Sequence, residues 1–271
     1  MELVYPPVVG LTRVLFGALG LRIDLRGAGR VPRSGPVVLA SNHVSFLDFT
    51  LLGLAAAPRR VRFLARHDLF THPAAGPLLR AMRHVPVDRD APAAAYLAAR
   101  GLVARGEVVG VFPEAGISRA YDVRAMMPGA VALAAATGAP LVPVAIWGPQ
   151  RVATAGRPTD LTRGRPVSIE VGEPVEVPAD ADVVAGTVDL AVTLQGMLDG
   201  LQSLPRHQPR PGEVAPWHPA HLGGAAPTRS EAEPRESIPR SAIRWWETAV
   251  GQRPVATGRD GSEIQPLQLP G

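Results

Sequence analysis

The sequence predicts an α/β fold, in which a mixed, largely parallel central sheet is flanked by helices. Three observations lead to this prediction. Short apolar runs typical of buried strands alternate with segments in which apolar residues recur at helical spacing. Turns that contain glycine and proline, such as 27–29 and 32–36, separate these segments. Finally, 46% of the 271 residues are hydrophobic, which is enough for one large domain with a substantial core.

The N-terminal segment 1–21 is predicted to be an apolar helix. Arg13 interrupts its apolar side chains and Arg22 follows it, so the uninterrupted stretch is shorter than the roughly 18–20 residues that span a bilayer. Such a helix can lie in the membrane interface, with its arginines reaching the headgroups. The alternative is an ordinary helix that packs against the sheet.

Residues 22–204 are predicted to form the sheet and the helices that cover it. Two strands alternate polar and apolar residues, as half-exposed strands do, and five are apolar runs. The alternating strands are expected at 22–26 and 167–171, and the apolar strands at 37–41, 61–65, 85–87, 108–112 and 141–147. Helices are expected at 45–57, at 74–82, from Pro92 to a glycine at 101 or 106, at 129–137 and at 187–201.

From about Pro205 the composition changes. Proline, arginine, glycine and serine dominate, and the apolar periodicity is lost. Segment 205–271 is therefore predicted to be a largely disordered tail, because it cannot bury enough apolar surface to order itself. Its one apolar cluster, 243–246, is either a short helix that docks on the domain or on lipid, or a fortuitous cluster.

Charge and composition exclude several classes of function. The formal net charge is +4, and all 28 basic residues are arginine. Arginine suits phosphate and anionic membrane surfaces, although a general compositional bias is the simpler explanation. Nucleic-acid binding is not expected, because no basic run is interleaved with aromatic residues. The absence of cysteine excludes disulfides and thiolate nucleophiles. No metal site is expected at His67 with His72 or at His218 with His221, since no matching carboxylates accompany them.

The segment 42–48 carries the strongest chemical signal. His43 follows a predicted buried strand, and Asp48 lies five residues later. An imidazole can take a proton from an alcohol near neutral pH, and a carboxylate can fix its tautomer. Within one helix the two side chains would point about 140° apart. We therefore expect His43 in a loop, folded back over a helix with Ser45 at its N-cap and Asp48 at N3. The alternative is that Asp48 only caps the helix.

Other polar residues also follow apolar runs. Arg89 follows the run that begins at Val85, and Glu114 follows the run 108–112. Active sites of open α/β sheets gather at the carboxyl ends of strands, so these residues are expected near His43. For Arg89 the alternative is a surface ion pair with a neighbouring aspartate, and for Glu114 it is a residue that caps the next turn.

This ordered set resembles the glycerolipid acyltransferase family, of the 1-acyl-sn-glycerol-3-phosphate acyltransferase type. The resemblance covers roughly residues 20–175, and four motifs in the right order carry it. They are His43 and Asp48 for H-x-x-x-x-D, 85–89 for the second block, Phe112-Pro113-Glu114 for the start of the third block and 142–144 for the fourth.

The resemblance implies an acyltransferase that moves a fatty acyl group from acyl-CoA or acyl carrier protein to a lysophospholipid hydroxyl. The default acceptor is 1-acylglycerol-3-phosphate, which would give phosphatidate in phospholipid biosynthesis. His43 is implied as the general base and Asp48 as its orienting partner, with neither a cofactor nor a metal. The implied substrate-binding residues are Arg89 for the acceptor's phosphate, and Glu114, Gly116, Ser118 and Arg119.

The partners implied in the same way are the acyl donor, the lysophospholipid acceptor and a membrane surface. The protein would be peripheral or monotopic at the cytoplasmic face of the cell membrane. An apolar groove for the acyl chain is expected as well. The third block departs from the family pattern: Ala115 replaces a glycine, Ile117 an arginine and Met127 a lysine. These changes leave the identity of the acceptor open.

Two other functions compete with acyl transfer. A serine hydrolase or thioesterase could use Ser41 or Ser45 with His43, although the chain lacks the G-x-S-x-G motif that exposes such a serine. A non-catalytic lipid-binding module is the second, since it would tolerate Ile117 and Met127. A pure lipid binder, however, has no need of a paired histidine and aspartate.

Overall fold

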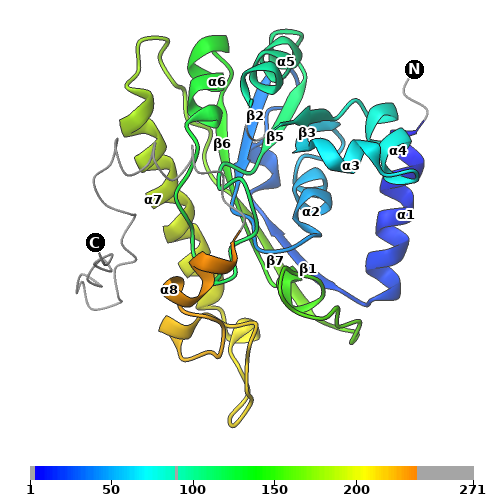
Figure 1. Cartoon of the computed structure of the whole chain (residues 1–271), viewed down its shortest axis with the longest axis vertical. Helices are drawn as coiled ribbons and strands as arrows, with labels where there is room; N and C mark the ends of the chain where they lie inside the picture. The colour runs from blue at the N-terminus through cyan, green and yellow to red at the C-terminus, as the bar shows by residue number, and fades with distance from the viewer. Residues whose placement is uncertain (1–3, 89–90, 237–271) are drawn as a thin grey trace.

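The computed structural model of the chain describes residues 4–88 and 91–236. Within these ranges seven strands form one sheet in the order β1-β7-β6-β2-β5-β3-β4 (Figure 1). Neighbouring strands are parallel except β6 and β7, which are antiparallel. The predicted mixed, largely parallel sheet is confirmed. The strands are β1 (Arg22–Arg26), β2 (Val37–Ser41), β3 (Val61–Arg66), β4 (Val85–Val87), β5 (Val108–Val111), β6 (Leu141–Trp147) and β7 (Pro166–Val171).

The helices cover both faces of the sheet, with α1 and α2 on one side and α6 and α7 on the other (Figure 1). Two helices of the described ranges, α3 and α8, were not predicted, because their five and four residues are too few to show a period. The helices are α1 (Tyr5–Ala18), α2 (Asp48–Ala55), α3 (His67–Thr71), α4 (Ala75–Ala81), α5 (Ala93–Ala104), α6 (Gly129–Thr137), α7 (Val183–Gln202) and α8 (Arg229–Ala232).

The central strands are apolar throughout because both of their faces are covered. Side chains alternate along β2, so that Val37 and Leu39 join the apolar cluster under α1 and α2. Val38 and Ala40 join the cluster under α5, α6 and α7. All four side chains are fully buried. The double cover fixes β2 rigidly in the middle of the sheet, directly before the loop that carries His43.

The chain leaves β2 and β5 in different directions. These strands are parallel neighbours, with Ala40 paired to Val111 near their carboxyl ends. The helix that follows β2 packs on one face of the sheet, and the helix that follows β5 packs on the other. Adjacent strands whose connections diverge in this way open a crevice where α/β proteins bind ligands. The loops after β2 and β5 are therefore the expected walls of a site.

Helix α1 packs against the sheet through only part of its surface. Phe16 is buried, and the backbone N–H of Val61 donates to the hydroxyl of Tyr5 over 3.0 Å. Leu11 and Val14, by contrast, are 70% and 67% exposed. The helix therefore covers the core and also presents an apolar face outward. None of the helices in the described ranges combines the length and apolar character needed to cross a bilayer.

The prediction of a structureless tail from residue 205 is wrong for residues 205–236. Short 3₁₀ turns, loops and α8 pack there against the sheet and α7 (Figure 1). The guanidinium of Arg151 lies 3.3 Å from the centre of the Trp217 ring, and the Nε2 atom of His207 lies 2.9 Å from the Ser168 hydroxyl. Single contacts of this kind can order a segment although its sequence shows no periodic pattern of apolar residues. Residues 237–271, including the apolar cluster 243–246, lie outside the described residues.

Candidate active site

His43 and Asp48 meet as predicted. The Nδ1 atom of His43 lies 2.8 Å from Oδ2 of Asp48. A carboxylate accepts only when the ring nitrogen carries the proton, so Nδ1 is the protonated nitrogen and Nε2 holds the basic lone pair. No hydrogen bond to Nε2 is found within the described residues, and the His43 side chain is 21% exposed. The free nitrogen of an oriented ring is thus available to a substrate hydroxyl.

The loop that holds this pair, residues 42–47, is built by short-range contacts. Oδ2 of Asp48 also accepts the backbone N–H groups of Val44 and Ser45, each over 2.7 Å. Three donors therefore converge on one carboxylate oxygen within six residues. This convergence folds the loop back over the first turn of α2 and places His43 above Asp48.

The start of α2 differs from the prediction. The helix begins at Asp48 rather than Ser45, and Leu47 is its N-cap. Long-range bonds hold the preceding turn outside the helix, because the hydroxyl of Ser45 and the N–H of Phe46 both donate to the carbonyl of Ala153. Ser45 nevertheless makes the predicted kind of contact, since its Oγ accepts the N–H of Leu47 over 3.1 Å.

Asn42 fixes the loop to the sheet. Its amide donates to the carbonyl of Ile146 over 3.0 Å, and its side-chain oxygen accepts the N–H of Ile146 over 2.8 Å. Both atoms of the amide are thus satisfied in a fully buried position. Because β6 cannot shift relative to Asn42, the residue that follows, His43, leaves the sheet in a fixed direction.

The ring of His43 stacks on Phe112, with centroids 4.4 Å apart and an interplanar angle of 25°. Phe112 is the first residue after β5, next to the carboxyl end of β2. It stacks in turn near Phe63 of β3, at 6.3 Å. The imidazole is therefore held at its Nδ1 edge by Asp48 and on one face by an aromatic ring.

Burial shapes the electrostatics of Asp48. The residue is fully buried, and this desolvation raises the pKa of its carboxyl above the usual value, while His43 and the N–H groups of Ser45 and Val44 oppose the rise. Its second oxygen, Oδ1, is buried and has no hydrogen-bond partner among the residues that the structure describes. A buried carboxylate that is not fully hydrogen-bonded stabilises a positive charge on the ring that it contacts.

Glu114 lies directly beneath the same loop. Its Oε1 accepts the backbone N–H of His43 over 2.8 Å, and its Oε2 accepts the backbone N–H of Arg124 over 3.0 Å. Burial raises the pKa of Glu114, while the charge of Arg124 acts against the rise. With both oxygens occupied in a fully buried carboxylate, Glu114 shapes the site by holding backbone rather than by meeting the substrate.

Of the other predicted residues of the third block, Ser118 contacts His43, and Gly116 and Arg119 lie further out. The N–H of Ser118 donates to the carbonyl of His43 over 2.8 Å, so Ser118 also fixes the catalytic loop. Gly116 is only half-buried. The guanidinium of Arg119 packs against Gly156, in the loop between β6 and β7, and has no ion pair among the described residues. Arg89 lies outside the described residues, so its contact with the acceptor's phosphate stays a prediction.

The serine-nucleophile alternative lacks the required geometry. The hydroxyl of Ser41 donates to the carbonyl of Asn42, and that of Ser45 donates to Ala153 over 2.6 Å. Both hydroxyl groups are committed to backbone carbonyls, and both residues are buried. His43 pairs with a carboxylate instead, so the geometry favours direct attack by an acceptor hydroxyl over an acyl-serine.

Three residues that support the site were missed by sequence reasoning. Phe112 was noted only as part of a motif, although its place after a strand could have indicated a stacking partner. Arg124 and Glu236 form a buried ion pair of 2.8 Å beside Glu114. No local pattern joins these two, because 112 residues separate them.

Comparison with known proteins agrees with this geometry. Residues 22–147 match the family described as Acyltransferase. A 1-acyl-sn-glycerol-3-phosphate acyltransferase of Bacillus subtilis is 33% identical over 139 residues, covering 49% of this chain and 69% of that protein. A lyso-ornithine lipid O-acyltransferase of Rhizobium meliloti is 33% identical over 128 residues, covering 45% of this chain and 42% of that protein.

The fold also has a close counterpart among solved structures. The crystal structure of the 1-acyl-sn-glycerophosphate acyltransferase of Thermotoga maritima superposes with a TM-score of 0.65 at 22% identity, covering 73% of this chain and 80% of that one. This likeness confirms the α/β architecture. Because the Bacillus subtilis relative is 33% identical and more than two thirds of its length is covered, the chain belongs to the glycerolipid acyltransferase family, whose members are enzymes that transfer acyl groups.

Proposed function

We propose that this enzyme transfers a fatty acyl group from acyl-CoA or acyl carrier protein to the free hydroxyl of 1-acylglycerol-3-phosphate, giving phosphatidate for phospholipid biosynthesis. The observation that carries the proposal is the bond between Nδ1 of His43 and Asp48, which leaves Nε2 as a base. The acceptor in the name of the Bacillus subtilis relative supports the choice of 1-acylglycerol-3-phosphate.

The chemistry is a direct transfer. Nε2 of His43 takes the proton of the acceptor hydroxyl while the oxygen attacks the thioester carbonyl. The carbon–sulfur bond then breaks, and the thiolate leaves with the proton that His43 returns. Asp48 stabilises the imidazolium between the two proton transfers. No acyl-enzyme forms, so positioning of donor and acceptor supplies much of the rate enhancement.

The test is an assay of thiol release from acyl-CoA with and without lysophosphatidate. His43→Ala should lower kcat at least about 100-fold, because it removes the general base. The matched control is His67→Ala, which deletes an exposed histidine of α3 and should leave kcat unchanged. Normal turnover by a folded His43→Ala enzyme, or release that does not depend on an acceptor, would refute the proposal.

A panel of acceptors addresses the headgroup. The lyso-ornithine lipid named for the Rhizobium meliloti relative has an amino-acid headgroup in place of a phosphate, so it is the natural comparison for lysophosphatidate. Arg89→Ala should raise the KM for lysophosphatidate and leave that for a lysolipid without phosphate unchanged. Arg119→Ala, run beside it, tests the other arginine of the predicted site. If Arg89→Ala raised the KM for both acceptors equally, Arg89 would not be the residue that binds the phosphate.

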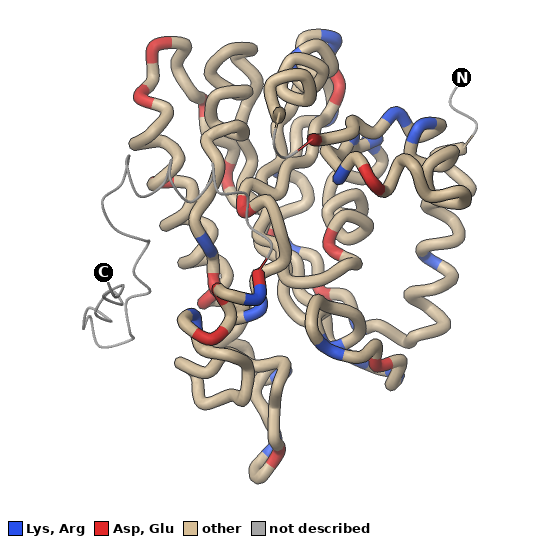
Figure 2. Tube along the Cα trace, viewed as in Figure 1, with Lys and Arg blue, Asp and Glu red and all other residues tan. Residues whose placement is uncertain are grey.

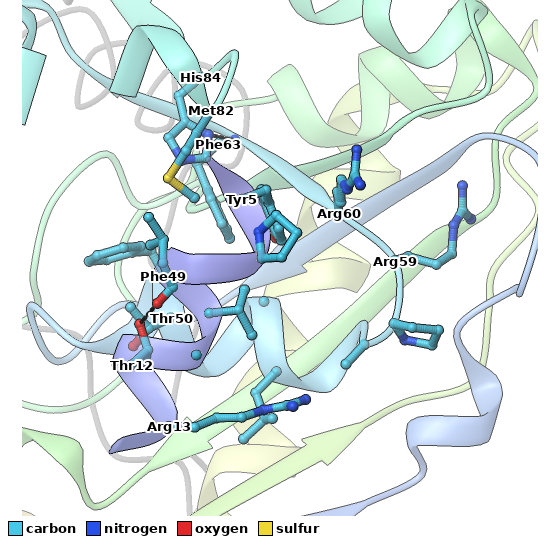
Figure 3. Close-up of a pocket in the computed structure, with 18 of the residues that line it drawn as sticks. Tyr5, Thr12, Arg13, Phe49, Thr50, Arg59, Arg60, Phe63, Met82 and His84 are labelled. Carbon is cyan, nitrogen blue, oxygen red and sulfur yellow. Dashed lines mark hydrogen bonds between the residues drawn. The ribbon is translucent and has the colours of Figure 1, made fainter. Parts of the chain in front are cut away.

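An apolar cavity beside the site suits the acyl chain. It has a volume of about 350 Å³, within the usual range for ligand pockets. Figure 3 shows Tyr5 from α1, Phe49 from α2 and Phe63 from β3 around it. Phe63 also lies 6.3 Å from Phe112, which stacks on His43. Two aromatic rings thus connect the cavity to the catalytic base.

Filling this cavity should change the preferred donor. Gly53 of α2 lines it, and a Cβ there would meet only the Tyr5 hydroxyl, at 3.8 Å. Gly53→Leu should therefore fold and should shift the kcat/KM preference towards shorter acyl-CoA chains. Gly196→Leu on α7 is the control, because a Cβ at Gly196 meets nothing within 4 Å and the residue does not line the cavity. An unchanged chain-length profile in Gly53→Leu would rule the cavity out.

The outward face of α1 suits a membrane surface at the cytoplasmic side of the cell membrane. Leu11, Val14 and Leu15 are exposed on it, and Arg13, which lines the cavity, is the one basic residue of α1 (Figure 2). Binding of this face to lipid would place the adjoining cavity beside its substrates. Leu11→Ser with Val14→Ser should lower flotation with anionic vesicles, whereas the equally exposed pair Leu97→Ser with Val192→Ser should not. Equal flotation of both double variants would remove this role of α1.

A further inference from the structure

The loop between β5 and α6, residues 112–128, is held under backbone strain. Ala115 and Tyr121 both have positive φ angles, of 55° and 64°. Side-chain-bearing residues in this region cost free energy and persist only where the surroundings hold them. The β5–α6 loop carries Glu114 and Ser118, which fix the backbone of His43. Whatever holds this loop therefore also holds the catalytic residue.

Part of the support comes from a segment outside the matched family region. Residues 228–236, the C-terminal strap, consist of α8 and the 3₁₀ turn that follows it. Thr228 and Glu231 form a complete capping box at the start of α8. The strap lies against the β5–α6 loop, and basic and acidic residues mingle where the two meet (Figure 2).

Glu236 is the central contact of the strap. Its Oε1 accepts the backbone N–H of Arg119 over 2.7 Å. Its Oε2 accepts from the guanidinium groups of Arg124, over 2.8 Å, and of Arg229, over 3.2 Å. One carboxylate thus binds the backbone and a side chain of the β5–α6 loop together with its own helix.

The ion pair is buried, which makes it sensitive to change. The side chains of Glu236 and Arg124 are 1% and 2% exposed. Removing one partner of such a pair leaves an uncompensated charge in a poorly solvated place. Arg124 also donates to the carbonyl of Glu114 over 2.9 Å and lies 3.5 Å from its carboxylate. The charge of Glu236 therefore decides how Arg124 is held, and Arg124 in turn holds Glu114.

The contacts continue to the catalytic histidine. Glu114 accepts the N–H of His43, and Ser118 donates to the carbonyl of His43. Ser118 is tied to the strap as well, because its hydroxyl lies 3.3 Å from Asp122 and 3.4 Å from the guanidinium of Arg229. Arg229 forms an ion pair with Asp122. Two routes thus join the strap to the backbone of His43.

We propose that Glu236 is a positioning residue of this enzyme, through which the C-terminal strap locks the β5–α6 loop against His43 in the geometry that receives the acceptor. The proposal rests on the proposed function. Asp48 orients the ring of His43 independently of the strap, so loss of Glu236 acts first on acceptor binding and less on the chemical step.

The experiment compares three variants. Glu236→Gln removes the charge and keeps the shape, and Glu236→Asp keeps the charge on a shorter side chain. Glu173→Gln is the control, because it removes the same charge from an exposed glutamate paired with Arg30. The measurements are KM and kcat for lysophosphatidate, KM for acyl-CoA, thermal midpoint, and amide hydrogen exchange of the segments 42–48 and 112–128.

Glu236→Gln should raise the KM for lysophosphatidate about tenfold or more, change the KM for acyl-CoA less than about twofold, and speed exchange at the amides of Arg119 and Arg124 at least about 100-fold. Glu236→Asp should recover part of both effects, and Glu173→Gln should show neither. A lowered thermal midpoint with unchanged kinetic constants would show a merely structural role and overturn the proposal. Unchanged exchange in 112–128 would overturn it as well.

Two further outcomes remain decisive. If Glu236→Gln does not fold, Asp122→Asn replaces it and is judged by the same criteria. This change weakens the partly exposed ion pair between Asp122 of the β5–α6 loop and Arg229 of the strap. If the wild-type enzyme shows no acyl transfer, the proposed function fails. Exchange at the His43 amide in Glu236→Gln then still decides whether the strap positions the loop.

Discussion

The two loops that meet at His43 are held in opposite ways. In the loop after β2, residues 42–47, the bonds to Asp48 span only three to five residues. In the β5–α6 loop the supporting partners are remote. Gln195 accepts the N–H of Val123 across 72 residues, and Glu236 accepts the N–H of Arg119 across 117 residues. The bonds that join His43 to Asp48 are therefore local, although other residues of the first loop also bond to β6, to Ala153 and to the β5–α6 loop. The second loop depends in addition on α7 and the C-terminal strap.

This difference separates the proposed base from the proposed acceptor site. The loop after β2 carries the pair of His43 and Asp48, whose proposed proton transfer would serve any hydroxyl acceptor. The β5–α6 loop carries the departures from the family pattern, Ala115, Ile117 and Met127. Because its supports lie in other parts of the chain, its geometry can change while the local bond to Asp48 still orients the ring of His43. Relatives named for different acceptors are consistent with such independence.

The largest expected effect tests the locally bonded pair in the loop after β2. Asp48→Asn should lower kcat by about 10²–10⁴, because a neutral amide no longer stabilises the imidazolium. If its NH₂ group takes the place of Oδ2, it also faces the three N–H donors that Oδ2 accepts. Hydrogen exchange in 112–128 should stay unchanged, since the side-chain bonds of Asp48 in the described part of the chain all go to residues 43–45. Asp68→Asn, at an exposed ion pair with Arg66, is the control. A variant with near-normal kcat would mean that the carboxylate is only a helix cap.

Acid should weaken the packing of segment 205–236, where His207 is buried against Ser168 of β7. Burial, with the nearby charge of Arg151, lowers the pKa of His207 to about 3. The unfolded chain takes up this proton near pH 6.5, and the folded chain does not, so stability falls as the pH drops below about 6.5. Between pH 7 and pH 5 this one residue should reduce the free energy of unfolding by about 2 kcal/mol.

Urea unfolding at the two pH values measures this loss. His207→Gln can still hydrogen-bond Ser168 but does not titrate, so its loss over the same interval should be smaller by that amount. Burial also lowers the pKa of His218 and of His221, so both act in the same direction. An identical pH dependence in wild type and His207→Gln would show that the buried histidine is not the cause.

The smallest expected effect concerns the strain in the β5–α6 loop. Ala115→Gly should raise the free energy of unfolding by less than about 1 kcal/mol, because glycine tolerates the positive φ but loses more conformational freedom on folding. Ala125→Gly in the same loop should instead lower it by about 0.5–1 kcal/mol, since that residue has no positive φ. The two are compared by chemical denaturation. A loss of stability in Ala115→Gly would show that the strain is negligible.

The same contrast explains what the sequence could predict. The approach of His43 to Asp48 was predictable because every bond that builds it lies between near neighbours. The strands were predictable as well, since burial on both faces leaves continuous apolar runs such as 37–41. The start of α2 was misplaced because Ser45 and Phe46 bond to Ala153, more than one hundred residues away.

The order of residues 205–236 could not be predicted for a related reason. The segment is held by individual contacts, such as Trp217 on Arg151 and Glu236 on Arg124, and not by an apolar face with a period. Each contact joins residues with no signal of pairing in the sequence. The residues that hold the acceptor side of the site were therefore visible only in three dimensions.

The distance along the chain between Arg119 and Glu236 also sets the order of events during translation. His43 and Asp48 can meet almost as soon as both have left the ribosome. Arg119 must wait for 117 further residues, which at about 5–20 residues per second is a delay on the order of ten seconds. In a nascent chain the pair of His43 and Asp48 can therefore form well before Glu236 is available to bind the β5–α6 loop.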